Sequence, residues 1–318
     1  MKNKLSVIAA LCAMAVLITA SSQVIASCRD ALTLCCELII PSLFPFFVVS
    51  VLLSRLGLPV YLEKLLSPFS AKLFGVSGAG ASALFVGLTG GYPLGASYIA
   101  DMHQQGHISC QEAERLLAFC NNSGPAFIIG AVGSGVFSSA RAGLLLYGVH
   151  ILSALLTGLL LRQKEAAVAC PAPRQPSSSL SQALPDSVRQ AVVSILNVCG
   201  FVVCFSVFAG LMDSGGFFPA MAGRLSELLG KELHWCRALL TGILELGSGA
   251  GAMRGLALTP ANLSLAAWIL GWGGISVHFQ TMAAIADTDI KGGLHFAGRL
   301  VSAFIGAGIA YLAGLLLL

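Results

Sequence analysis

The sequence predicts an all-α, polytopic membrane protein. Of its 318 residues, 56% are hydrophobic and only 10% are charged, and the mean hydropathy is +0.86. Soluble domains average about 25% charged residues, so this chain lacks the polar side chains that would cover a water-facing surface. The 36 glycines and 12 prolines agree with this class, because membrane helices tolerate both residues better than soluble helices do.

Long apolar stretches divide the chain into about seven transmembrane helices. A spanning helix needs about 20 apolar residues, and the stretches that qualify are 1–27, 31–57, 116–137, 142–161, 188–212, 263–285 and 294–318. Two further segments, 59–76 and 215–232, carry charged residues on an apolar background. We expect both to lie as amphipathic helices in the membrane interface.

The first stretch, 1–27, has a second interpretation. The sequence Ile25-Ala26-Ser27-Cys28 loosely resembles a lipoprotein cleavage site, so this stretch could be a signal that is removed. We favour a retained N-terminal transmembrane helix. Removal would leave the remaining topology unchanged.

Segments 77–104 and 233–255 are apolar but are interrupted by helix-breaking residues. The interruptions contain Gly87, Gly90, Gly91 and Pro93 in the first segment, and Gly242, Gly247, Gly249 and Gly251 around Glu245 in the second. Backbone groups freed at membrane depth are tolerated only where they are buried in protein or line a wet cavity. We therefore predict two re-entrant helical hairpins whose tips lie near the midplane.

The order of these elements repeats on either side of a segment rich in Pro, Ser and Arg. Residues 163–188 are expected to form a flexible linker between a first repeat at 31–162 and a second repeat at 189–318. With three full crossings and one hairpin in each repeat, the second repeat is inverted relative to the first.

The distribution of basic residues predicts the orientation, because Lys and Arg concentrate on the cytoplasmic side. With the N-terminus in the cytoplasm, twelve of the 18 Lys and Arg residues fall on the inner side, Arg299 among them. The bias is moderate, so the opposite orientation stays open. Inverted repeats with broken elements that meet at the midplane are the architecture of many secondary transporters.

The candidate solute-binding residues of the first repeat lie at its two interruptions. They are Thr89, Gly90, Gly91 and Tyr92 in the hairpin, and Asn121, Asn122 and Ser123 in the span that follows. An Asn side chain costs too much to leave unpaired in hydrocarbon. These side chains therefore either line a solute site, which we favour, or form interhelical hydrogen bonds. Tight packing through small residues is the alternative for the hairpin.

The second repeat supplies Glu245, Ser276, His278 and Gln280 as candidate solute-binding residues. An ionisable residue within the membrane usually faces a cavity and marks an ion or substrate path; for Glu245 the alternative is an ion pair with Arg254 or Arg237. The other three follow a glycine-rich break. Their alternation fits an unwound stretch, because on a helix they would point in different directions.

Other classes of function are not supported. The sequence has no HExxH, GxSxG or nucleotide-binding loop, so we expect neither an enzyme nor a cofactor. It has no basic run of the kind that binds nucleic acid. Most of the ten cysteines lie in apolar stretches without zinc-site spacing, and we do not expect Asp101, His103 and His107 to hold a metal. The expected partners are the lipid bilayer and a small molecule or ion, with homo-oligomers left open.

Several motifs resemble the YlbJ family of sporulation integral membrane proteins. The motifs are 41–46, 85–96, 116–133, 242–247 and 273–280, and the likeness extends from about residue 31 to the C-terminus. The resemblance implies the nucleoside-recognition Gate domain, which is also found in nucleoside transporters and in the ferrous-iron transporter FeoB. It further implies a role in spore formation, at the cortex or coat stage. No GTPase domain accompanies it here, so iron transport of the FeoB type is not expected.

We therefore expect a multi-pass protein of the cell membrane with a cytoplasmic N-terminus. The favoured function is that of a transporter or channel-like permease for a small solute, which the resemblance suggests is nucleoside-like. The alternative is a non-transporting membrane scaffold needed for spore cortex or coat formation. In such a scaffold the polar groups at the midplane would pair with each other.

Overall fold

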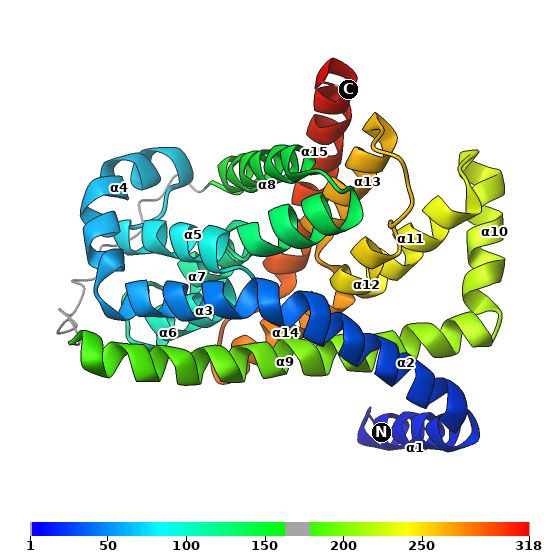
Figure 1. Cartoon of the computed structure of the whole chain (residues 1–318). Coiled ribbons are helices and arrows are strands. Elements are labelled where there is room, and N and C mark those ends of the chain that lie inside the picture. The colour runs from blue at the N-terminus through cyan, green and yellow to red at the C-terminus, as the bar shows by residue number, and fades with distance from the viewer. Residues whose placement is uncertain (1, 163–178, 318) are drawn as a thin grey trace.

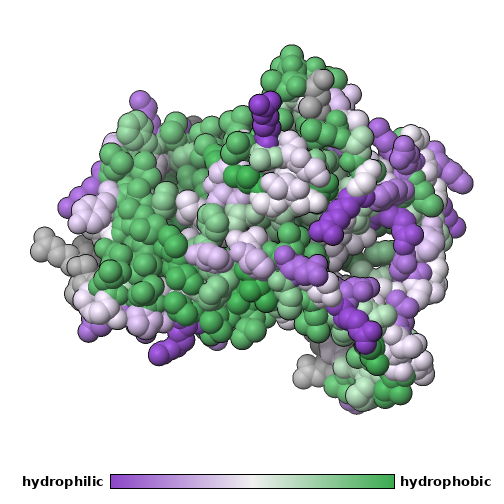
Figure 2. Space-filling model, viewed as in Figure 1, coloured by the Kyte–Doolittle hydropathy of each residue, from purple (hydrophilic) through white to green (hydrophobic). Residues whose placement is uncertain are grey.

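The computed structural model describes residues 2–162 and 179–317, which form helices and short connections without a single strand (Figure 1). This confirms the predicted all-α class. Figure 2 shows hydrophobic side chains over the middle of one face, with hydrophilic ones gathered toward its ends. Such a surface suits a bilayer. Four helices among the described residues are long and apolar enough to cross a membrane, or five if a bent helix pair counts as one span.

Two long helices lie side by side through the molecule (Figure 1). The first run combines α2 (Ser21–Leu34), the π-helical turn η1 (Cys35–Ile39) and α3 (Ile40–Arg55), and the second is α9 (Leu180–Ser214). Each run has 35 residues. At 1.5 Å per residue this is about 52 Å, well beyond the roughly 30 Å of a hydrocarbon layer.

The remaining helices confirm that the order of elements repeats. After each long helix come a surface helix, a helical hairpin, a broken helix and a further long helix. In the first half these are α4 (Leu58–Phe74), α5 (Gly78–Gly90), α6 (Leu94–Gln104), α7 (Cys110–Cys120), η2 (Ala126–Val136) and α8 (Ala140–Leu160). In the second half they are α10 (Phe217–Leu229), α11 (Leu233–Leu244), α12 (Leu246–Gly251), α13 (Pro260–Trp272), α14 (Gly274–Ala284) and α15 (Gly293–Leu317).

The first hairpin forms where the sequence places its breakers. Ser77 begins α5 by accepting a hydrogen bond from the backbone N–H of Gly80 at 3.1 Å, as an N-cap residue does. The helix ends at Gly91, whose φ of 81° lies in the left-handed region. The second arm, α6, starts directly after Pro93, which has no N–H to leave unpaired. In the second hairpin the break falls at Glu245 and the returning arm, α12, has only 6 residues.

The N-terminal boundaries differ from the prediction. The chain bends after α1 (Lys2–Thr19), at Ala20, and the predicted division between 27 and 31 lies inside α2. Ser27, Arg29 and Asp30 make that region polar, but it contains neither Gly nor Pro, so backbone hydrogen bonding continues through it. The excess length of the 35-residue run lets these polar residues lie beyond the apolar layer.

The predicted linker is shorter than expected. The segment 163–178 lies outside the described residues, but 180–188 forms the first turns of α9. Pro185 is accommodated within this helix. Arg55 on α3 contacts Asp186 at 3.5 Å and Gln190 at 3.3 Å. These contacts hold the start of α9 against the end of α3.

The surface helix α4 carries an apolar stripe. Tyr61, Leu65 and Phe69 are exposed and four residues apart, so they lie on one face. A bend of 95° separates α4 from α5. The stripe and the bend support the predicted interfacial position. The amphipathic prediction for 215–232 corresponds to α10, which exposes Phe217 and Leu228.

Gly87 sets the closest approach in the first half. A Cβ atom at Gly87 would overlap the carbonyl of Cys120, so α5 and α7 touch backbone to backbone. We predict that Gly87→Ala forces these helices apart and lowers the free energy of unfolding by about 1–3 kcal/mol or more, as overpacking does. Thermal unfolding of the purified protein in detergent measures this.

Gly200→Ala is the matched control, because Gly200 lies within α9 with no atom within 4 Å of an added Cβ. Alanine in a helix interior stabilises the folded state by about 0.5–1 kcal/mol relative to glycine, so this variant should be as stable as the wild type or slightly more stable. Equal stability of the two variants would contradict the close contact between α5 and α7.

Candidate functional site

The two hairpin tips and the two helix breaks converge on one place in the structure. A Cβ on Gly91, at the first tip, would lie 2.8 Å from the backbone nitrogen of Gly124 in the break between α7 and η2. In the second half, a Cβ on Gly274 would lie 2.9 Å from the backbone nitrogen of Leu246 and 3.1 Å from the Cα of Glu245. The Tyr92 hydroxyl of the first tip lies against Gly273, which ends α13. The interruptions of both halves are therefore in contact.

A small cavity of about 40 Å³ lies at this convergence. Its polar side chains are Tyr92, Ser123, Glu245 and Gln280, all of which the sequence singled out. Its apolar lining residues include Ile39, Leu43, Phe127, Val198, Val202, Leu246 and Val277. Since a single water needs about 10–15 Å³ by this measure, the cavity holds a few waters at most.

Glu245 stands at the break of the second hairpin in an extended conformation and is 2% exposed. Its carboxylate accepts hydrogen bonds from the backbone N–H groups of Gly247 at 2.8 Å and Ser248 at 2.5 Å. It thereby caps α12, where a negative charge is favoured by the helix dipole. None of the ion pairs among the described residues joins Glu245 to Arg254 or Arg237. Arg237 instead pairs with Asp213 at 2.5 Å.

The hydroxyl and amide groups that line the cavity are unusually free. The hydroxyls of Tyr92 and Ser123 lie near each other but form no hydrogen bond of normal geometry with the described residues. The side-chain oxygen of Gln280 is also buried without a partner among them. Buried polar atoms are usually paired. These three are therefore available to a bound molecule.

Asn121 and Asn122 are fully buried and form hydrogen bonds with protein groups, although the Asn121 amide oxygen has no partner among the described residues. Asn121 donates to the Thr281 hydroxyl of α14 at 2.8 Å. Asn122 donates to the carbonyl of Phe119 at 2.7 Å and accepts from the Arg299 guanidinium at 2.8 Å. Neither side chain lines the cavity. Their contacts match the interhelical alternative that the sequence left open.

Thr89 and Gly90 also lie away from the central cavity. The Thr89 hydroxyl donates to the carbonyl of Phe85 in its own helix at 2.8 Å. Its side chain faces a gap of about 10 Å³ between α3, α4 and α5. Gly90 is buried against Leu94 and Ser50. At the first tip, it is therefore Tyr92 whose side chain reaches the cavity.

The stretch after the second break is helical, which corrects the prediction that it is unwound. The break is confined to Gly273 and Gly274, with φ values of 85° and 79°, and α14 begins at once. Ser276 and Gln280 are one turn apart and share a face, whereas His278 points elsewhere. The His278 ring packs 4.3 Å from Trp272 and 4.1 Å from Phe296, centroid to centroid.

Arg299 is the principal residue that the sequence reasoning misplaced. It is 0% exposed within α15, and its guanidinium lies 5.6 Å from the ring centre of Tyr92, a cation–π distance. Its second nitrogen donates to the carbonyl of Leu270 at 3.5 Å. Because it is buried, it carries no information on orientation. Its position inside an apolar span was the available signal, since such ionisable residues are rare and usually functional.

His150 of α8 also belongs to this region. Its Nε2 accepts the backbone N–H of Ser123 at 3.1 Å, and the ring is 2% exposed. The histidine thus pairs a backbone group that the break between α7 and η2 leaves without a helical partner. It also fixes the position of Ser123 at the cavity wall.

A larger cavity of about 330 Å³ lies beyond the first hairpin, between α3, α4, α5, α6 and α9. Leu94, two residues after Tyr92, lines it, so both cavities reach the start of α6 near the tip of the first hairpin. Its polar wall includes Arg55, Glu63, Asp101 and His107. We call it the vestibule.

The contact between Asn121 and Thr281 can be tested by a double-mutant cycle. Thr281→Val leaves the Asn121 amide buried without its acceptor, so it should lower the free energy of unfolding by about 1–3 kcal/mol. Adding Asn121→Ala should then cost little more, because the unpaired group is gone. Denaturant or thermal unfolding in detergent measures both.

Thr281→Ser is the control, since it keeps the hydroxyl, and it should be close to wild type. If the losses from Thr281→Val and Asn121→Ala were simply additive, the two side chains would not be paired in the folded protein.

No protein-family model matches the sequence. The sporulation integral membrane protein YlbJ of Bacillus subtilis (strain 168) is 32% identical over 302 residues, covering 86% of this chain and 73% of that protein.

The fold is similar to solved structures of CNTnw. An outward-facing state aligns with a TM-score of 0.59 and 14% identity over 99% of this chain and 83% of that chain. The inward-facing substrate-bound state aligns with a TM-score of 0.53 and 13% identity over 98% of this chain and 83% of that chain. An intermediate state aligns with a TM-score of 0.57 and 14% identity over 98% of this chain and 84% of that chain. At these identities the likeness is one of fold.

Proposed function

Since this chain belongs to the family of the sporulation integral membrane protein YlbJ, we propose that it is a permease that moves a small solute across the cell membrane. The observation that carries the proposal is the small cavity, with four polar side chains in its wall, where two hairpin tips and two helix breaks meet. Discontinuous helices of inverted repeats form the binding sites of many secondary transporters.

The binding groups would be those of the cavity wall. Tyr92 and Ser123 offer hydroxyls that lie near each other, and Gln280 offers an amide oxygen; none of these oxygens forms a hydrogen bond of normal geometry with the described residues. Glu245 uses each carboxylate oxygen once, for Gly247 and Ser248, and keeps further lone pairs. Together with the Phe127 ring, this set suits a solute with hydroxyl and amide groups and a flat apolar part. A nucleoside-like molecule has these features.

The transport path would run from the vestibule past the tip of the first hairpin into the central cavity. At about 40 Å³ the cavity is too small in this state for a solute of drug size, because pockets for such solutes have volumes of roughly 300–1,000 Å³. CNTnw, which shares the fold, is found in outward-facing, intermediate and inward-facing states. We infer that this chain also changes between states in which the cavity opens to one side at a time.

The vestibule would face the cytoplasm. It lies at the end of the molecule where α3 finishes at Arg55 and where α9 begins. Lys64 and Lys72 of α4 belong to the neighbouring surface helix. Basic residues favour the cytoplasmic side, which agrees with the orientation predicted from the sequence.

Solute flux into vesicles tests the function. With purified protein in liposomes, we expect uptake of labelled nucleosides above that of empty liposomes. Glu245→Gln and Gln280→Ala should each lower uptake about tenfold or more, because each removes a polar contact worth about 1.5 kcal/mol or more.

Glu227→Gln, an exposed carboxylate on α10, is the matched control and should transport normally. Thermal unfolding confirms that each variant is folded. Uptake at the wild-type level by both Glu245→Gln and Gln280→Ala would show that the central cavity does not lie on the transport path.

A membrane scaffold is the second candidate function, favoured by the buried pairing of Asn121, Asn122 and Arg299. Chemical labelling separates the two. Ser123→Cys puts a thiol on the cavity wall, and a permease that opens should allow a small water-soluble thiol reagent to reach it.

Cys120 is the internal control, because this last residue of α7 is 0% exposed, contacts α5 and lies outside the cavity. It should stay unlabelled. A Ser123→Cys protein as unreactive as Cys120 over hours would favour the scaffold.

A further inference from the structure

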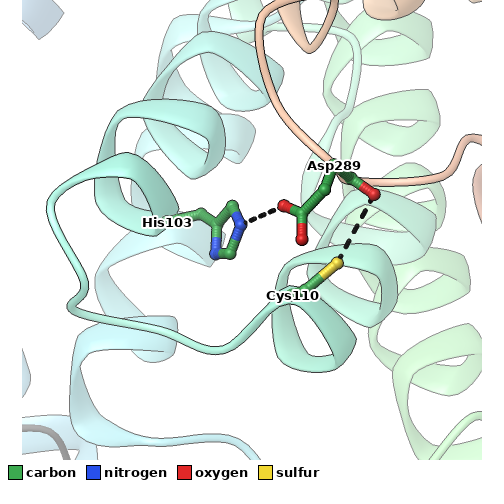
Figure 3. A group of neighbouring side chains, drawn as sticks. All are labelled: His103, Cys110 and Asp289. Atoms are coloured by element: carbon green, nitrogen blue, oxygen red, sulfur yellow. Dashed lines mark hydrogen bonds and ion pairs between the residues drawn. The ribbon is translucent and has the colours of Figure 1, made fainter.

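Three side chains with metal-binding atoms meet at the periphery of the fold, away from the central cavity (Figure 3). His103 lies at the end of α6, Cys110 is the first residue of α7, and Asp289 lies in the connection between α14 and α15. Their imidazole nitrogen, sulfur and carboxylate oxygen all lie within 4.8 Å of one another. The connection between α6 and α7 thus meets a loop from the other half of the chain.

The two connections are held together by further contacts. The side chain of Gln104 donates to the carbonyl of Asp287 at 3.4 Å. The backbone N–H of Lys291 donates to the carboxylate of Glu114 at 3.1 Å. These hydrogen bonds flank the three side chains on either side, so their meeting is built into the fold.

The hydrogen bonding of His103 points to a cation at this place. Its Nδ1 lies 3.1 Å from the carbonyl oxygen of Ile108, and its Nε2 lies 2.6 Å from a carboxylate oxygen of Asp289. Both neighbours are acceptors, whereas a neutral imidazole has only one N–H. If Nδ1 carries the proton, the lone pair of Nε2 faces a carboxylate. A positive charge between them removes this repulsion, either as a second proton on the ring or as a metal ion.

Cys110 distinguishes the metal ion from the proton. Its sulfur lies 3.6 Å from the backbone oxygen of Asp289 and 3.9 Å from the carboxylate of Glu114. A histidine–aspartate ion pair gains nothing from a neighbouring thiol, but a metal ion gains a third ligand. The bond from Nδ1 to Ile108 is then the outer contact that orients metal-binding histidines.

We propose that His103, Cys110 and Asp289 bind one divalent transition-metal ion of the zinc class. One nitrogen, one sulfur and one oxygen ligand suit Zn²⁺, which is typically tetrahedral in proteins, and water or Glu114 can take the fourth position. Zinc–ligand bonds of about 2.0–2.3 Å place tetrahedral ligands roughly 3.3–3.8 Å apart. On binding, the widest separation between ligand atoms must therefore close by about 1 Å, whereas Nε2 of His103 and the Asp289 carboxylate oxygen, 2.6 Å apart, must separate by about 1 Å. The Asp289 side chain, which is 74% exposed, is free to make this movement.

The ion would tie the first hairpin and α7 to the start of α15. The site therefore joins the two halves of the chain at their periphery and does not depend on transport by the central cavity. The sequence grouped His103 with Asp101 and His107, but the latter two line the vestibule. The ligands of the proposed site are too far apart in the sequence to form a spacing motif.

Cobalt binding to the full chain tests the proposal. Purified protein in detergent is treated with EDTA, dialysed and titrated with Co²⁺, which gives an ultraviolet charge-transfer band when a thiolate binds it. We expect a band that saturates at one ion per chain and is displaced by Zn²⁺. The band should disappear in Cys110→Ser, and the affinity should fall about tenfold or more in His103→Gln and Asp289→Asn.

Two substitutions outside the proposed ligand set serve as controls. Asp287→Asn changes an exposed carboxylate in the same loop, and Cys204→Ser changes an exposed thiol on α9. Both should bind Co²⁺ like the wild type. Zn²⁺ should also raise the unfolding temperature of the wild type but not of Cys110→Ser. A missing band, a band that survives Cys110→Ser, or a wild-type unfolding temperature indifferent to Zn²⁺ and EDTA would overturn the site.

Discussion

The fold depends on satisfying the backbone groups that four interrupted helices leave unpaired. The last carbonyls of a helix have no partner within it, and hydrocarbon supplies none. Here each interrupted helix end has a carbonyl that accepts from a side chain. The pairs are Leu88 with Tyr147, Phe119 with Asn122, Ile243 with Trp272 and Leu270 with Arg299, at 3.2, 2.7, 3.0 and 3.5 Å.

Two of these donors lie on the long helix that ends each half of the chain. Tyr147 belongs to α8 and Arg299 to α15, the corresponding long helices of the two halves. The buried charge of Arg299 is compatible with this role, because the C-terminal end of a helix carries partial negative charge. None of the ion pairs among the described residues involves it. Carbonyl dipoles, the Asn122 amide and the Tyr92 ring surround it instead.

The sequence predicts the interruptions well because their causes are local. Gly91 and Pro93 end and restart the first hairpin, and Gly273 breaks the second span, each through its own backbone preference. It predicts the boundary near Ser27 poorly, because polarity alone does not break a helix. The position of Ser276, His278 and Gln280 was misjudged for the converse reason. One glycine pair suffices for the break, and the helix resumes at once.

The partners of the site residues depend on contacts between distant parts of the chain. Asn121 with Thr281, Asn122 with Arg299, and His103 with Asp289 each join the two halves of the chain. No local pattern encodes such pairs. The sequence could therefore identify Asn121 and Asn122 as polar groups that need partners, but it could not decide between a solute and another helix.

The distribution of satisfied and unsatisfied groups separates the residues that hold the fold from those that can bind. Asn122, His150 and Arg299 each form a hydrogen bond with a backbone group at a helix break. Their substitution would therefore disturb the backbone whether or not a solute is present. Tyr92, Ser123 and Gln280 keep polar atoms without a hydrogen bond of normal geometry among the described residues, and their side chains line the central cavity. Glu245 does both, because its carboxylate caps α12 and borders the cavity. A ligand that forms a hydrogen bond with this carboxylate would weaken the cap. Ligand binding is thereby coupled to the stability of α12, the shortest arm of the two hairpins.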